Sequence, residues 1–224
     1  MPKLFLVTRS EENYIKTIFH LGGSSSTLIA TNAIAEQMET KPSSVTDMAK
    51  KLADKGIVYY KKYQGVCLTD IGVKKALSII RKHRLWEVFL VEKLDFTWDE
   101  VHEVAEQLEH IKSEKLIDRI DALLEFPKYD PHGDPIPGKD GTFLKQDKQL
   151  LSEVPLNKVA VCVGVKDTSP TFLKFLDKNK IALGDTIEVL EKEEFDHSLL
   201  IKLANHELSI SHQIASNLYV KINY

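Results

Sequence analysis

The spacing of apolar residues differs between the two ends of the chain. Apart from two β-rich runs around Gly65, apolar residues from 10 to about 126 recur every three to four positions, which is typical of helices, and from about 154 they alternate as in strands. Between these parts lies "PKYDPHGDPIPGKDG" (127–141), where four Pro and three Gly in fifteen residues end helical structure. Flexible linkers are usually rich in Gly and Ser, so this stretch indicates a shaped loop. The sequence therefore predicts an α+β fold, mainly α, with the β structure at the C-terminal end.

Three helices followed by a hairpin are predicted at the N-terminus. Apolar faces indicate the helices, and two β-rich runs, "IVYYKKY" and "VCLTD", follow on either side of Gly65. Ser10 and either Ser43 or Ser44 have the residue type and position of helix caps. This order of elements is that of a winged helix-turn-helix, which we expect over residues 1–72. The three helices are expected at 10–21, 31–38 and 43–56.

A helical middle domain is predicted over residues 73–140, followed by a linker at 141–153. Thr97 with Glu100 three residues later has the pattern of a capping box, which places the start of one helix at residue 97. The middle helices are expected at 71–94, 97–112 and 113–126.

The tail, residues 154–224, is predicted to be an SH3-like small β-barrel. Its strands alternate apolar and polar residues, and tight turns such as the one at Gly184 separate them. One short helix is expected at 170–179. The strands are expected at 158–165, 186–193, 198–204, 206–211 and 218–222.

The net charge of −3 hides an uneven distribution. Residues 1–84 hold 14 Lys and Arg against 7 Asp and Glu, a balance of +7, whereas residues 85–140 hold 6 against 15, a balance of −9. A basic head and an acidic middle favour a polyanion as the partner of the first and cations as the partner of the second. No apolar run is long enough to cross a bilayer, and the two cysteines lack ligand or redox spacing. We expect a cytoplasmic protein without a membrane partner.

The second helix of a helix-turn-helix places its N-terminal residues in the major groove of double-stranded DNA. Short polar side chains there can read base edges, and the lysines that follow can bind phosphates. Two alternatives stay open: the lysines form a solvated face, or the winged helix binds a protein. The predicted DNA-binding residues are Ser43, Ser44, Thr46, Asp47, Lys50, Lys51, Lys61 and Lys62.

The stretch "VHEVAEQLEHIKSE" (101–114) is rich in potential metal ligands. A preceding helix adds His83 and Glu87, four residues apart, and the Pro-rich loop adds Asp130 and His132. Oxygen and nitrogen ligands without thiolate suit Mn²⁺ or Fe²⁺ better than structural Zn²⁺. The alternative is a charged, solvated helix face. If the stretch is helical, four ligands share one stripe at i, i+4, i+7 and i+8: His102, Glu106, Glu109 and His110.

A catalytic role is not expected. "EQLEH" is similar to the H-x-x-E-H pattern of inverted zinc peptidases, but its first residue is Glu106 and no third ligand or general base accompanies it. The chain has no phosphate-cradling Gly loop and no dinucleotide fingerprint. We therefore predict no enzyme and no small-molecule substrate.

Five stretches together resemble the diphtheria toxin repressor family of iron- and manganese-dependent transcriptional repressors. They are "ENYIKTIFHL", "KPSSVTDMAKKLADKGIV", "LTDIGVKKALSIIRKHRLWEVFL", "VHEVAEQLEHIKSE" and "PHGDPIPG", and the tail "FLKFLDKNKIALGDTIEVLEKE" is similar to the family's SH3-like, FeoA-type domain. The resemblance implies a metal-dependent repressor that binds a palindromic DNA operator as a homodimer. Leu85, Phe89 and Leu123 are candidates for the dimer surface, or else they belong to the domain core.

The resemblance also implies two metal sites. Iron sensors of the family carry a cysteine at the position of Glu106, so this glutamate favours Mn²⁺ as the cofactor, with Fe²⁺ as the alternative. The implied primary ligands are Asn13, His83, Glu106, Glu109 and His110. The implied ancillary ligands are Glu87, Asp130, His132 and Asp167, with His102 as an outside possibility.

Two residues depart from the family pattern. Asn13 stands where an aspartate or methionine is usual, and its neutral amide oxygen is a weaker ligand. Lys16 stands where manganese sensors without a tail have a second glutamate in the first helix, which argues for separate sites over a two-metal cluster. The rival to a metal-dependent repressor is a metal-independent winged-helix interaction module whose acidic middle domain binds a protein.

Overall fold

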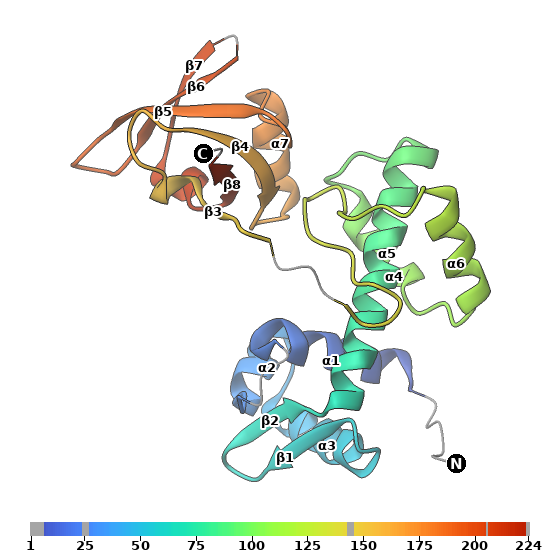
Figure 1. Ribbon diagram of the computed structural model, residues 1–224. Helices are drawn as coiled ribbons and strands as arrows, with labels where there is room; N and C mark the ends of the chain where they lie inside the picture. The colour runs from blue at the N-terminus through green and yellow to red at the C-terminus, as the bar shows by residue number, and fades with distance from the viewer. Residues whose placement is uncertain (1–6, 24–26, 143–145, 205, 223–224) are drawn as a thin grey trace. The chain divides into compact units, whose positions relative to one another are not determined.

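The computed structural model describes residues 7–23, 27–142, 146–204 and 206–222 (Figure 1). The chain forms two compact units. The first holds the N-terminal residues to His83 with 106–115 and 137–142, and the second holds 84–105, 116–136 and the chain from 143 onward. The predicted division at residues 72, 140 and 153 follows different boundaries and stays a prediction.

The N-terminal elements have the predicted winged-helix order. Helices α1 (Arg9–Gly22), α2 (Thr31–Gln37) and α3 (Pro42–Asp54) precede the antiparallel hairpin of β1 (Val58–Lys61) and β2 (Gly65–Leu68), which is the wing. Each helix buries one apolar stripe, and the hairpin closes over the same core. Its fully or almost fully buried members include Ile15, Ile34, Val45, Leu52, Ile57 and Val66.

Two predicted helix caps are wrong. Helix α1 begins after Thr8, whose side chain accepts from the Glu11 N–H while the Glu11 carboxylate accepts from the Thr8 N–H, so Ser10 lies inside the helix. Helix α3 begins at Pro42, which fits the first turn because that turn needs no N–H there. Ser43 and Ser44 are therefore first-turn residues with side chains directed outward.

The wing is joined to the connection before α2 through a site that only glycine fits. Ile29 and Val66 exchange both backbone hydrogen bonds, at 2.8 and 2.9 Å. Gly65 has φ +126, and a Cβ there would lie 2.3 Å from the Ile29 carbonyl oxygen. This close approach fixes the base of the wing against the helices.

The middle helices are α4 (Asp70–Leu94), α5 (Val101–Leu108) and α6 (Glu114–Leu123). Helix α5 is shorter than predicted, since it starts four residues after Thr97 and ends at Leu108. Glu109 and His110 lie in the turn that follows, so the expected four-residue helical stripe is wrong. Tertiary contacts of these two side chains, described below, override the local helical pattern.

The C-terminal domain is a six-stranded antiparallel sheet in the order β3-β8-β4-β5-β6-β7 around one apolar core. The five predicted strands are present, and the sequence missed the two-residue β3 and the short α8. The elements are β3 (Gln149–Leu150), η1 (Leu151–Glu153), β4 (Val159–Val165), α7 (Pro170–Lys178), β5 (Thr186–Lys192), β6 (Leu199–Leu203), β7 (His206–Ile210), α8 (His212–Ala215) and β8 (Leu218–Ile222). Within the described residues, no helix has the length and apolar character needed to cross a membrane.

Candidate metal centres and nucleic-acid interface

A buried cluster joins α1, α4 and the end of α5. His83 Nδ1 lies 2.7 Å from Glu109 Oε2, and ligand atoms of His83, Glu106 and Glu109 all lie within 4.8 Å of one another. Lys16 Nζ donates to both oxygens of Glu109, each at 2.8 Å, and also to Glu106. Glu109 is fully buried. With Asn13 and His110, these residues are called the Glu109 centre below.

The Glu109 centre contains two ligand atoms whose hydrogen-bonding capacity is unused. Asn13 Oδ1 and His110 Nε2 are both buried and have no hydrogen-bond partner. Leaving such an atom unsatisfied costs about 1–3 kcal/mol, so an arrangement of this kind needs a reason. His110 Nε2 lies 3.7 Å from Glu109 Oε1, and both atoms are common metal ligands. The residues of the centre therefore fit a divalent cation.

The other ring nitrogen of His110 is held by a residue that the sequence did not single out. His110 Nδ1 lies 2.6 Å from Glu12 Oε2. A carboxylate there keeps the proton on Nδ1 and leaves Nε2 as the lone-pair nitrogen, which is the usual second layer of a histidine metal site. Glu12 could not be recognised as a site residue from the sequence, because an acidic residue in the first turn of a helix is common.

Glu109 is kept ionised despite its burial. Burial by itself would raise the pKa of Glu109, but the hydrogen bond from His83 and the positive charge of Lys16 outweigh it, and the pKa lies below its ordinary value. The carboxylate is thus available as an anionic ligand at neutral pH.

A second buried cluster, called the Glu87 centre, consists of Glu87, Asp130 and His132. Their ligand atoms lie within 4.8 Å of one another, and all three side chains are buried. Glu87 Oε2 lies 3.7 Å from His132 Nδ1, and Glu87 Oε1 lies 3.4 Å from His102 Nδ1. His102 contacts the centre from a half-exposed position, with 51% of its side chain accessible.

The Pro-rich loop orients two members of the Glu87 centre. Asp130 Oδ1 accepts from the backbone N–H groups of His132 and Asp134, and Asp130 Oδ2 lies 3.2 Å from Arg84 Nε. The His132 ring stacks on Trp98, and His132 Nε2 lies 2.8 Å from the Trp98 carbonyl oxygen. Because Nε2 is taken up by this carbonyl, Nδ1, which faces Glu87, is the ring nitrogen that could bind a metal once it carries no proton.

Charge is less evenly balanced at the Glu87 centre. Burial, followed by the charge of Glu87, raises the pKa of Asp130 to about 6, although Arg84 acts in the opposite direction. Burial would lower the pKa of His132, but its hydrogen bond and charge interaction with Glu87 raise it above the ordinary value. Two buried carboxylates near one imidazole can therefore accept further positive charge.

The structure does not bring Asp167 into the Glu87 centre. Among the described side chains it belongs to no cluster of potential ligands, and its Oδ1 accepts from the Ser169 N–H at 2.8 Å. Strand β4, which ends two residues before Asp167, is nevertheless adjacent to the loop, because the Val165 N–H donates to the His132 carbonyl at 3.0 Å. The role of Asp167 as a ligand stays a prediction.

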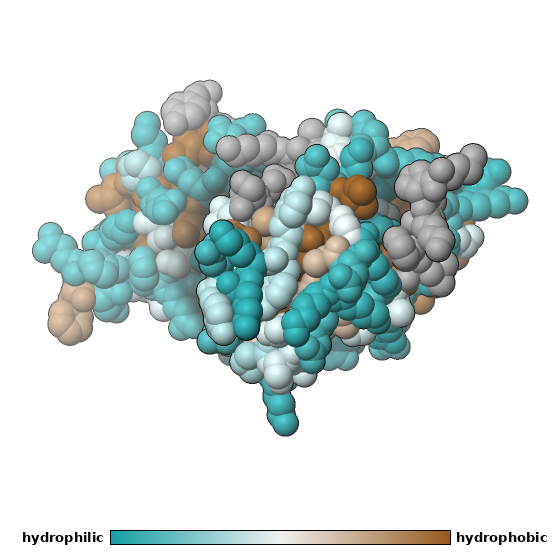
Figure 2. Space-filling model, turned by 90° about the horizontal axis from the view of Figure 1, so that it is seen from below, coloured by the Kyte–Doolittle hydropathy of each residue, from teal (hydrophilic) through white to brown (hydrophobic). Residues whose placement is uncertain are grey.

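The predicted DNA-binding side chains lie on α3 and the wing. All are exposed except Thr46, which is half-buried with its hydroxyl donating to the Pro42 carbonyl at 3.0 Å. Lys62 lies over the ring of Tyr63 at the wing tip, and Tyr63 is 93% exposed. Seen from below, hydrophilic side chains cover most of this face (Figure 2). The surface can therefore meet a polar, charged partner such as a DNA backbone.

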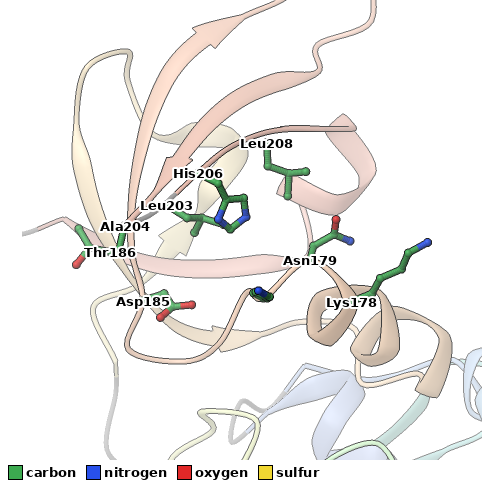
Figure 3. Close-up of a pocket in the computed structure, with 9 residues that line it drawn as sticks. Lys178, Asn179, Asp185, Thr186, Leu203, Ala204, His206 and Leu208 are labelled. Atoms are coloured by element: carbon green, nitrogen blue, oxygen red, sulfur yellow. The ribbon is translucent and has the colours of Figure 1, made fainter.

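The C-terminal domain also has a pocket of about 530 Å³ near the end of α7 and the β6–β7 hairpin (Figure 3). None of the predicted site residues lines it. The lining consists of Lys178, Asn179, Lys180, Asp185, Thr186, Leu203, Ala204, His206 and Leu208.

A winged helix followed by helices that hold buried carboxylate and imidazole clusters defines a metal-responsive class of DNA-binding protein. Three domain profiles support this class. Residues 6–66 match the iron dependent repressor N-terminal DNA binding domain, residues 69–138 match the iron dependent repressor metal binding and dimerisation domain, and residues 149–222 match the FeoA domain. The chain belongs to the iron-dependent repressor family, that of the diphtheria toxin repressor, whose members are metal-dependent transcriptional repressors and not enzymes.

Proteins named for iron and for manganese resemble the chain. The HTH-type transcriptional regulator MntR of Oceanobacillus iheyensis is 37% identical over 123 residues, which are 55% of this chain and 82% of that protein. The iron-dependent repressor IdeR of Mycobacterium leprae is 33% identical over 127 residues, which are 57% of this chain and 55% of that protein. A solved structure of a manganese-dependent transcriptional repressor complex with manganese has a TM-score of 0.85 and 33% identity, covering 95% of this chain and 100% of that one.

The chain spans about half of the length of some curated relatives and only 31% of another. The shared domains therefore support an inference about function, and the activities of the longer proteins are not carried over.

Proposed function

We propose that the protein is a manganese-dependent repressor that binds its operator when the Glu109 centre holds a metal ion. The observation that carries this proposal is the pair of buried, unpartnered ligand atoms, Asn13 Oδ1 and His110 Nε2, beside the fully buried Glu109. Asn13 belongs to the DNA-binding head, so a ligand bond from its side chain ties α1 to the other residues of the centre.

When bound, a divalent cation supplies positive charge that Glu106 and Glu109 share. His83 and Glu109 already lie in hydrogen-bond contact, and Glu12 holds the His110 ring with Nε2 available. Asn13 links this set to the helix that packs on α3. Holding α1 through Asn13 sets the position of α1 and, with it, that of the recognition helix α3, so metal and DNA should favour each other's binding by about 1–3 kcal/mol.

The ligand set favours Mn²⁺, with Fe²⁺ as the alternative. The set offers carboxylate, amide and imidazole groups, and the two cysteines are buried outside both centres. Hard oxygen ligands suit Mn²⁺, whereas a thiolate at the position of Glu106 would suit softer ions. Of the related proteins above, one is named for iron and one for manganese, which is compatible with either ion.

A homodimer on a palindromic operator is the proposed DNA-bound form. The two recognition helices of such a dimer meet half-sites about 34 Å apart. Leu85 is fully buried, which favours the alternative place in the domain core, and Phe89 packs edge-on against Trp86. Leu123 is 58% exposed and remains a candidate, together with Leu116 and Phe126.

A fluorescence anisotropy titration tests the proposal. Full-length protein is titrated against labelled palindromic DNA with Mn²⁺, with Fe²⁺ under reducing anaerobic conditions, and with chelator. We expect Mn²⁺ to tighten binding and chelator to reverse it. Affinity that is unchanged by either addition would favour the rival, a metal-independent interaction module.

A further inference from the structure

A lysine ammonium occupies the centre of the carboxylate pair. Lys16 Nζ lies 2.8 Å from both oxygens of Glu109 and also contacts Glu106, and only 11% of the Lys16 side chain is accessible. Glu106 and Glu109 are the same two carboxylates whose oxygens cluster with His83. In this structure the two carboxylates of the Glu109 centre therefore already share a positive charge that belongs to the chain.

This ammonium and a divalent ion would compete for the same carboxylate oxygens. Lys16 lies against both carboxylates, so a divalent ion bound there would stand close to a second positive charge. In a buried site, water screens the remaining repulsion only weakly. The three donors of an ammonium also need acceptors at the same oxygens that a metal would bind. A metal that takes these oxygens would thus displace the lysine from them.

We propose that Lys16 is an internal competitor of the metal at the Glu109 centre, and that displacing it sets the metal concentration to which the protein responds. The inference rests on the proposed function, because it assumes that the centre binds a divalent ion.

The same helix carries both the competitor and a ligand. Asn13 and Lys16 are three residues apart in α1, a spacing that places them on neighbouring positions of one helix face. Lys16 links α1 to Glu106 and Glu109 through ion pairs, whereas Asn13 offers its unpartnered Oδ1. Metal binding therefore exchanges the link through Lys16 for the link through Asn13, and α1 stays attached through a different residue.

Direct measurement of Mn²⁺ affinity tests the inference. Chelator-treated full-length protein competes for Mn²⁺ with a fluorescent chelator at one pH above neutrality. Lys16→Gln removes the charge, Lys16→Arg keeps it, and Lys158→Gln removes the charge of an exposed lysine as the matched control. We expect Lys16→Gln to bind Mn²⁺ tighter by about tenfold or more, which corresponds to about 1.4 kcal/mol. Lys16→Arg and Lys158→Gln should bind no more tightly than the wild type.

Thermal unfolding with and without Mn²⁺ tests the inference even if Lys16→Gln is unstable. Lys16→Gln removes the ammonium that contacts Glu106 and Glu109, so its Tm should fall in chelator and rise more with Mn²⁺ than that of the wild type. A variant that folds only with Mn²⁺ supports the exchange as well, since the metal then replaces the missing ammonium.

The outcomes separate the inference from the proposed function. Wild-type affinity in Lys16→Gln, or equal tightening in Lys16→Arg, overturns the competitor role while metal binding stands. Absence of Mn²⁺ binding in the wild type and in Lys16→Gln overturns both. If Lys16→Gln binds Mn²⁺ and the wild type does not, the lysine excludes the metal completely, which supports the competitor role.

Discussion

The two buried centres balance their charge differently. The Glu109 centre has a lysine between its carboxylates and two buried ligand atoms without partners. In the Glu87 centre, Asp130 is paired with Arg84 and bonded to backbone N–H groups, and none of its three side chains is among the unpartnered buried atoms of the described residues. The first centre thus has hydrogen-bonding atoms that the protein leaves unused, whereas Asp130 of the second has its hydrogen bonds made within the protein.

This difference indicates different roles. A group that lacks partners gains most when a ligand arrives, so the Glu109 centre is suited to sense a metal. The Glu87 centre is built from the Pro-rich loop, whose Gly133 (φ +85) would place a Cβ 2.1 Å from the Val163 carbonyl oxygen. Such a loop is fixed by its own packing, and metal there would mainly stabilise what is already formed.

Loss of Glu109 should have the largest effect. Glu109→Gln removes an anionic ligand and the partner of Lys16 and His83, and we expect Mn²⁺ affinity at this centre to fall by about a hundredfold or more. Metal-dependent DNA binding should disappear with it. Competition titration and anisotropy measure the two effects.

Glu87→Gln is the matched variant in the other centre. It makes the same chemical change in a buried carboxylate and should leave most of the metal-dependent DNA binding in place. The opposite result, with Glu87→Gln abolishing the response and Glu109→Gln preserving it, would reverse the roles assigned to the two centres.

Glu11 can be compared with the carboxylates of the two centres, because it is also buried but has no role in metal sensing. It pairs with Lys55 at 2.7 Å and Lys51 at 3.1 Å, which ties α1 to α3. Burial by itself would raise the pKa of Glu11, but the hydrogen bonds from Lys55, the Thr8 N–H and Lys51 lower it to about 2. The ionised form therefore stabilises the fold above about pH 4.5, and this contribution is lost as the pH falls towards 2.

Glu11→Gln should lower the free energy of unfolding by about 2–3 kcal/mol at pH 7. The difference from the wild type should shrink between pH 4.5 and pH 3 in urea titrations. Glu36→Gln, an exposed change in α2, should show neither effect. A difference that stayed constant down to pH 3 would contradict the ion-pair origin.

Glu12 should have an intermediate effect on metal binding. Glu12→Gln weakens the hold on His110 Nδ1, and losing such an outer partner typically costs about 10–100-fold in metal affinity. The competition titration with Mn²⁺ measures the change, again with Glu36→Gln as the control. Equal affinity in the two variants would show that His110 is oriented by other groups or does not bind the metal.

Local patterns were sufficient to predict most of the fold. The helix order and five strands follow from apolar spacing, which each segment carries in its own residues. Strand β3 was missed because its two residues form a strand only by pairing with Val220 and Tyr219 of β8. The end of α5 was misplaced because the helical pattern continues through Glu109, whose carboxylate is held by residues far away in the sequence.

The candidate site was predicted less completely than the fold. Residue type and spacing indicated Glu106, Glu109, His110 and His83 as potential ligands, whereas only the resemblance to the repressor family indicated Asn13. The contact of Lys16 with Glu109 joins residues 93 positions apart, and no local pattern encodes it. Sequence therefore shows which groups could bind a metal, but not which cation of the chain lies among them.

The smallest predicted effect concerns Asp167. Its Oδ1 accepts from the Ser169 N–H at 2.8 Å, and Asp196 Oδ1 accepts from the Ser198 N–H at 2.9 Å in the same way. Asp167→Asn and Asp196→Asn should both keep their turns, because an amide oxygen accepts the same hydrogen bond. If Asp167 supplies a ligand to the Glu87 centre, only Asp167→Asn should weaken Mn²⁺ binding there, by about tenfold or less.

Measuring this in a Glu109→Gln background isolates the Glu87 centre. Equal affinity for the two Asn variants would assign Asp167 to its turn alone, and Glu87, Asp130 and His132 would then be the whole protein contribution. Since those three side chains already cluster within 4.8 Å, that result would support a centre formed before metal arrives. A selective loss in Asp167→Asn would show that the C-terminal domain completes the centre, and that metal draws this carboxylate away from the Ser169 N–H.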